Sequence, residues 1–115
     1  MTNSIINNNR LTKLSIGKLS KYNLIIGNKC TSNVIDGVLS FSGGSEKNTS
    51  SSNFIECTNT DTACRCILCQ NEGTTDNNSI NDTMVLPSTA TRNLFFAELS
   101  PATGNNATNN ITFKK

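Results

Sequence analysis

Five cysteines are the residues of this chain with the widest chemical range, and four of them are clustered. Cys57, Cys64, Cys66 and Cys69 fall within thirteen residues, while Cys30 stands alone. Thiolates bind zinc at about 2.3 Å, and two thiols in contact can form a disulfide. The spacing therefore leaves three interpretations open, which are a metal site, disulfides and buried thiols.

A zinc site would need a tight knuckle at the C-x2-C pair. Cys66 and Cys69 would supply two ligands, and Cys57 and Cys64 the other two. The two residues between the pair are apolar rather than turn-forming. If residues 63–70 form a strand instead, Cys64 and Cys66 share one face and Cys69 lies on the other, so they do not meet at one metal. We therefore expect no cofactor and keep zinc as an alternative.

Disulfides are the second interpretation. Cys57 and Cys64 form the most natural pair, because the segment between them is polar and resembles a hairpin connection. Cys30 could then bridge Cys66 or Cys69. Five is an odd number, so at least one thiol stays free or pairs with another subunit. Reduced, buried thiols that pack as small apolar groups are the third interpretation.

The remaining composition argues against catalysis. The chain has no histidine, so it has neither a Ser/His or Cys/His nucleophile pair nor a histidine metal ligand. The eight carboxylates fall singly. We expect no enzymatic activity, and no small-molecule substrate is evident.

Short polar side chains dominate the sequence. The 115 residues include 19 asparagines, 13 serines and 15 threonines, whereas only 16% are charged and the net charge is +2. These residues suit turns and exposed strand faces, and they disfavour helices. We therefore expect an all-β protein.

Apolar and polar residues alternate in short segments, which predicts roughly seven to eight strands of about 5 to 8 residues. The candidate strands are residues 13–19, 22–26, 34–42, 53–57, 63–70, 84–86, 93–99 and 111–115. The dense apolar content around Phe96 predicts a central strand buried on both faces. Polar segments 46–52, 71–82 and 101–110 are expected to be loops.

This pattern is typical of a small sandwich, jelly roll or barrel. No internal repeat is evident. We expect residues 1–9 to form a flexible N-terminal segment and residues 10–115 to form a single β domain. Five N-x-[ST] sequons indicate exposure more than glycosylation; they begin at Asn48, Asn77, Asn81, Asn106 and Asn110.

Positive charge is concentrated near the N-terminus, before the first acidic residue. Candidates for contact with another subunit are Arg10, Lys13, Lys18 and Lys21. The alternative is that lysines on an edge strand discourage unwanted pairing. Tyr22 is the only nearby aromatic residue for base stacking, which argues against a nucleic-acid partner.

These observations together predict a self-assembling structural subunit of a fibre, shell or particle surface, such as a virion or spore surface. Copies of the chain would join into a homo-oligomer or filament by strand pairing and apolar contacts, with disulfide bonds as an optional lock. The alternative is a small zinc-binding module that contacts an acidic partner or nucleic acid. No apolar run is long enough to span a membrane and no signal peptide is evident. We favour a particle or extracellular surface over the cytosol.

Overall fold

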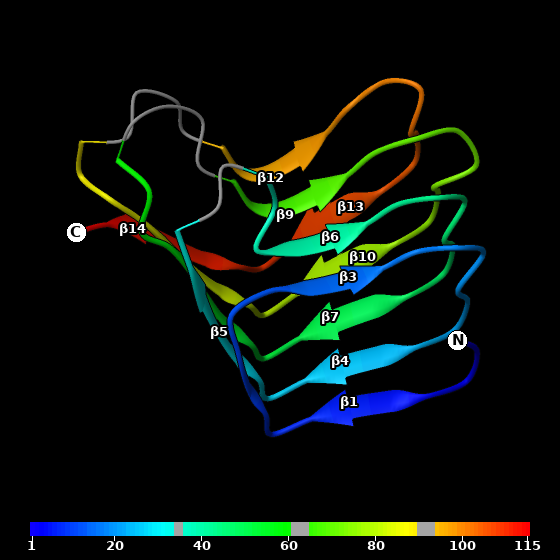
Figure 1. Cartoon of the computed structure of the whole chain (residues 1–115), viewed down its shortest axis with the longest axis horizontal. Coiled ribbons are helices and arrows are strands. Elements are labelled where there is room, and N and C mark those ends of the chain that lie inside the picture. The colour runs from blue at the N-terminus through cyan, green and yellow to red at the C-terminus, as the bar shows by residue number, and fades with distance from the viewer. Residues whose placement is uncertain (34–35, 61–64, 90–93) are drawn as a thin grey trace.

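The computed structural model describes residues 1–33, 36–60, 65–89 and 94–115, and the regular elements in these residues are all short strands (Figure 1). Their bounds are β1 (Ile5–Asn7), β2 (Arg10–Leu11), β3 (Leu14–Ile16), β4 (Leu24–Ile26), β5 (Lys29–Ser32), β6 (Leu39–Phe41), β7 (Thr49–Ser51), β8 (Phe54–Cys57), β9 (Arg65–Cys69), β10 (Asn78–Ile80), β11 (Thr83–Leu86), β12 (Leu94–Glu98), β13 (Asn106–Thr108) and β14 (Ile111–Lys114).

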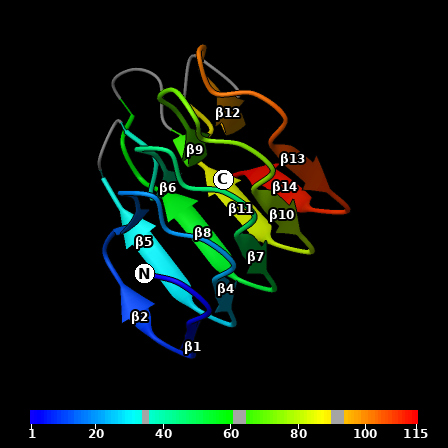
Figure 2. The same ribbon diagram turned by 90° about the vertical axis from the view of Figure 1, so that its right-hand side faces the viewer.

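Consecutive strands lie in three different sheets, and all pairings are parallel. The first sheet has the order β1-β4-β7-β10-β13, the second β14-β11-β8-β5-β2 and the third β12-β9-β6-β3. The chain therefore winds as a β-solenoid in which each rung gives one strand to each sheet, from β1, β2 and β3 to the last rung of β13 and β14. Figure 2 shows the second sheet, with its strands side by side.

The expectation of a sandwich, jelly roll or barrel is wrong. Short strands and polar turns occur in those folds and in a solenoid alike, so alternation alone does not separate them. The deciding feature is which strands pair. Each strand pairs with the equivalent strand one rung away, for example Ile6 with Ile25, rather than with its sequence neighbour.

Three polar segments expected to be loops contain strands of the first sheet, namely β7, β10 and β13. β1 lies within the first nine residues and pairs with β4. β12 was expected to be central, but it is the edge strand of the third sheet, and Phe96 is only partly buried. The buried strands of that sheet are the two inner ones, β6 and β9.

A five-residue pattern recurs at two corners of every rung. A strand of the first sheet, a residue with positive φ and an inward polar residue lead into the second sheet, as in β4, Gly27 and Asn28. Asparagine and glycine tolerate this left-handed backbone conformation best. In every rung the residue just before each of the two corner positions has a positive φ. These residues are Asn3, Asn8, Tyr22, Gly27, Lys47, Ser52, Asp76, Asn81, Gly104 and Asn109.

The core is a thin column along the solenoid axis. Its largest fully buried side chains include Ile25, Phe41, Ile55, Ile67 and Met84. In the second and third sheets apolar residues stack from rung to rung, as Cys30, Ile55 and Met84 do, whereas the first sheet places Ser50 and Ser79 after Ile25. At the first rung the column is open, because Ile6, Leu11 and Leu14 are only partly buried.

Candidate assembly surfaces at the ends of the solenoid

A ladder of asparagines, of which Asn23, Asn48 and Asn77 are buried, runs along the corner that precedes the first sheet. This first ladder contains Asn23, Asn48, Asn77 and Asn105. At each step the backbone N–H and the side-chain Nδ2 of one residue both donate to Oδ1 of the next, at 3.1 and 2.8 Å from Asn48 to Asn77. Nδ2 of Asn48 also donates to the Ser20 carbonyl of the preceding rung at 3.0 Å. The carboxamides thus satisfy backbone groups that the turns leave unpaired.

A second ladder runs along the corner between the first and second sheets. It contains Asn9, Asn28, Asn53, Asp82 and Asn110. The donor direction is the same, since the N–H of Asn28 donates to Oδ1 of Asn53 at 2.8 Å. In both ladders the bonds to the next residue's side-chain oxygen therefore run toward the C-terminal end of the solenoid.

Asp82 replaces the asparagine of one rung and is fully buried. A carboxylate cannot donate, and two serines compensate for this. The hydroxyls of Ser50 and Ser79 each donate to Oδ2 of Asp82 at 2.7 Å. Oδ1 accepts from the backbone N–H and Nδ2 of Asn53 at 2.8 and 3.0 Å. Four hydrogen bonds therefore reach this buried side chain.

The N-terminal end of the solenoid is apolar at its centre. Ile6, Leu11 and Leu14 pack against the core but are only partly buried, because no earlier rung covers them in the described structure. β1, β2 and β3 lie at one edge of their sheets, so their outward backbone groups have no neighbouring strand there. Such an edge is a template for pairing with another chain.

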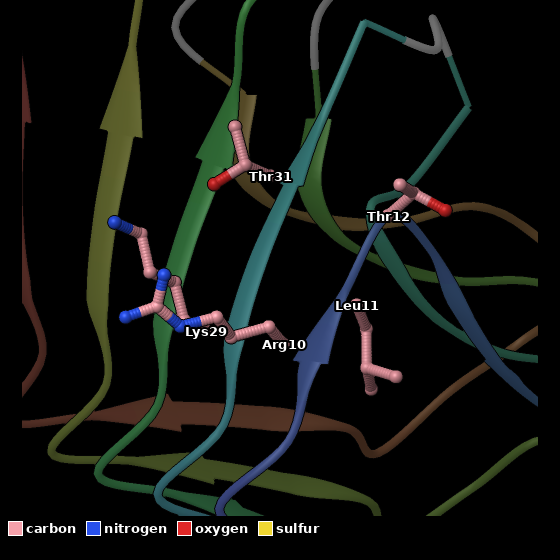
Figure 3. Close-up of a pocket in the computed structure, with 5 residues that line it drawn as sticks. All are labelled: Arg10, Leu11, Thr12, Lys29 and Thr31. Atoms are coloured by element: carbon pink, nitrogen blue, oxygen red, sulfur yellow. The ribbon is translucent and has the colours of Figure 1, made fainter.

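This end is also basic. The first nineteen residues contain Arg10, Lys13 and Lys18 and no acidic residue. Arg10 is the register partner of Lys29, and the Lys29 ammonium lies 5.5 Å from the Phe54 ring centre. In Figure 3, Arg10 and Lys29 extend to the same side while Leu11 points the other way.

Of the four basic residues expected to act in assembly, three lie on the first rung. The fourth, Lys21, pairs with Glu46 of the next rung. That contact raises the pKa of Lys21 and lowers the pKa of Glu46, mainly through the hydrogen bond between their side chains. Lys21 is therefore engaged within the chain, which leaves Arg10, Lys13 and Lys18 at the end face.

The C-terminal end is formed by β13 and β14, whose residues are all exposed. Its inward positions carry Ala107 and Thr112, which continue the columns of Ile25 and Ile55. Ile111 and Phe113 are 63% and 44% exposed on this rung. The inward positions of the two ends thus differ, because β1 and β2 carry Ile6 and Leu11 there, whereas β13 and β14 carry Ala107 and Thr112.

The structure does not bring the described cysteines together as a metal site. Cys30, Cys57, Cys66 and Cys69 are buried in β5, β8 and β9. Among the residues described, no three Cys, Asp or Glu side chains are placed to hold a metal ion. Burial raises the pKa of Cys30 to about 11 and, with a smaller effect of Glu98, that of Cys69 to about 12.

Cys64, which belonged to the expected zinc set and to the most natural disulfide pair, lies outside the described residues. Cys66 is engaged by the backbone, since its thiol lies 3.5 and 3.4 Å from the carbonyls of Ile55 and Val85. A buried thiol of this kind is what the third interpretation describes, in which the cysteines pack as small apolar groups with a weak donor.

The sequons do not all mark exposed positions. Asn48 and Asn77 are fully buried ladder residues, so the expectation of exposure is wrong for them. The ladders themselves were not anticipated. A signal for them exists in the sequence, because polar residues five positions apart recur at residues 4 and 9, 23 and 28, 48 and 53, 77 and 82, and 105 and 110.

Comparison with protein-family models, with curated proteins and with solved structures found no match. Within the part of the chain that the structure describes, no helix has the length and apolar character needed to cross a membrane.

Proposed function

We propose that this protein is a structural subunit that assembles end to end into a filament. The observation that carries the proposal is the pair of open solenoid ends. Both carry strand edges with unpaired backbone groups in the described structure, and the first rung leaves Ile6, Leu11 and Leu14 only partly covered. Stacking of another copy would pair the edges of the first and second sheets and bury Ile6 and Leu11.

The geometry of a solenoid favours this kind of association. Two different ends meet in a head-to-tail contact, and a head-to-tail contact that does not close generates an open filament. Each added copy would extend the parallel sheets in the direction in which they already run. Fibre formation by this route needs no catalytic group and no cofactor.

Cysteine bridges are not required by this proposal. Cys30, Cys57, Cys66 and Cys69 are all buried inside the rungs, away from the end faces. We therefore expect assembly to be the same with and without a reductant.

The test is the particle size of the purified chain, measured by light scattering and negative-stain microscopy across a concentration series, with and without reductant. Filaments that lengthen with concentration in both conditions are the expected result. A monomer of 12.4 kDa at all concentrations would refute the proposal. Filaments that dissolve on reduction would instead assign the contact to cysteine.

A further inference from the structure

The two asparagine ladders end differently at the C-terminal end. In the first ladder, the backbone N–H and Nδ2 of Asn105 donate to Oε2 of Glu98 at 2.7 and 2.9 Å. The Glu98 carboxylate thus takes the place that the Oδ1 of a further rung would occupy. In the second ladder, Asn110 accepts from the Asp82 N–H at 2.8 Å, but no described group accepts from its own N–H.

The N-terminal end shows the matching difference. Ser4 stands at the first-ladder position, where it donates its N–H to Oδ1 of Asn23 at 3.0 Å but carries no carboxamide. Asn9 stands at the second-ladder position and donates its N–H and Nδ2 to Oδ1 of Asn28 at 2.9 and 3.1 Å. No described group donates to the Oδ1 of Asn9. The first ladder is therefore closed at both ends, and the second is open at both.

Resting on the end-to-end assembly proposed above, we propose that the second ladder runs continuously from one copy to the next. The N–H and Nδ2 of Asn110 donate to Oδ1 of Asn9 in the next copy. Glu98 occupies the space that Ser4 of that copy leaves empty. The partner is a second copy of this chain, bound head to tail in a single register.

This register also determines which side chains meet. By continuation of the strand pairing, Ile6 of the next copy covers Ala107, and its Leu11 covers Thr112, so large side chains lie over small ones. The third sheet has one strand fewer than the other two. The junction therefore pairs strands in the first and second sheets and leaves β12 unpaired by β3 of the next copy.

Charge favours head-to-tail over head-to-head contact. Two N-terminal ends face to face would bring together two sets of Arg10, Lys13 and Lys18 without any acidic residue between them. The C-terminal end carries Glu98 as well as Lys114 and Lys115, and Lys115 pairs with Glu56 at 3.0 Å. A head-to-tail contact therefore places an acidic side chain beside the basic first rung, whereas a head-to-head contact of two N-terminal ends does not.

The test uses three variants of the full chain in the same assembly assay, each first checked by circular dichroism for an unchanged fold. Asn9→Ala removes the proposed acceptor but keeps the backbone bond to Asn28, and should raise the critical concentration about tenfold. Asn7→Ala, on the exposed face of the same rung, is the matched control and should leave it unchanged.

The third variant, Ser4→Asn, adds a carboxamide where Glu98 is proposed to lie, and should block assembly. Combining Ser4→Asn with Glu98→Ala should restore it, because the new carboxamide can then accept from Asn105. If the wild-type chain does not polymerise, the proposed function itself is wrong. If it polymerises and Asn9→Ala and Ser4→Asn have no effect, the filament is real but its junction is not this one.

Discussion

Replacing Asn48 by alanine tests whether the buried ladders stabilise the fold. Asn48 accepts the N–H and Nδ2 of Asn23 at 3.0 and 2.8 Å and donates to the Ser20 carbonyl and to Asn77. Its removal leaves the buried Asn23 N–H without its acceptor. Nδ2 of Asn23 keeps a bond to the Met1 carbonyl at 3.2 Å.

A buried polar group without a partner costs about 1–3 kcal/mol. One N–H is orphaned fully and the Ser20 carbonyl loses a donor, so we expect Asn48→Ala to lower the free energy of unfolding by about 2–4 kcal/mol. Asn48→Asp keeps the shape and the acceptor, but it turns a carboxylate oxygen toward Oδ1 of Asn77 and the Ser20 carbonyl. Its loss should be at least as large, because two acceptors then face a buried charge.

The measurement is urea unfolding followed by far-UV circular dichroism at one fixed protein concentration, since assembly would add stability. With a slope of about 1–3 kcal/mol per molar urea, the midpoint should fall by about 1 M or more. Asn106→Ala is the control, because Nδ2 of Asn106 bonds to the Gly104 carbonyl at an exposed site. If Asn48→Ala unfolds at the same urea concentration as this control, the ladder does not stabilise the fold.

Three further outcomes follow from other buried groups. Ser79→Ala removes a donor to buried Asp82 and should lower the free energy of unfolding by about 1.5–3 kcal/mol. The loss should be smaller in an Asp82→Asn background, and equal losses in the two backgrounds of this double-mutant cycle would contradict the pairing. Gly37→Ala should destabilise the fold by at least about 1 kcal/mol, because a Cβ there would lie 2.6 Å from the Cβ of Leu68. An unchanged melting temperature would show that the backbone shifts to relieve this contact without loss of stability. The fold raises the pKa of Cys69 to about 12, against an ordinary value of 9.0. The stability that the protonated thiol contributes is therefore complete below about pH 9 and is lost as the pH rises to about 12. Cys69→Ala should weaken this fall in the free energy of unfolding, and parallel pH curves for the two proteins would exclude the thiol as its cause.

Alternation identified several strands in which apolar residues point inward, but it missed β1, β2 and β5. The segments around Leu24, Ile55 and Met84 were predicted in this way and are strands. Where the inward residue is a serine, as at Ser50 and Ser79, no alternation exists, and β7 and β10 were predicted to be loops. Pairing of equivalent strands was not predictable from periodicity at all.

The repeat was missed because its length varies. Successive members of the first ladder corner are separated by 19, 25, 29 and 28 residues. The variation arises mainly between the second and third sheets. β2 and β3 are separated by two residues, whereas β8 and β9 are separated by residues 58–64. A search for a repeat of fixed length therefore does not detect the rungs. The five-residue spacing between the two ladder corners, in contrast, is the same in every rung.

The asparagine excess has a structural cause in this solenoid. Eight of the nineteen asparagines lie in the ladders and another five adopt positive φ. A ladder of identical asparagines would accept a slip by one whole rung, because every step offers the same bonds. Asp82 does not, since its carboxylate needs the hydroxyls of Ser50 and Ser79 beside it. Composition therefore sets the geometry of the corners, while one buried acidic side chain and its two serines distinguish the native register from its neighbours.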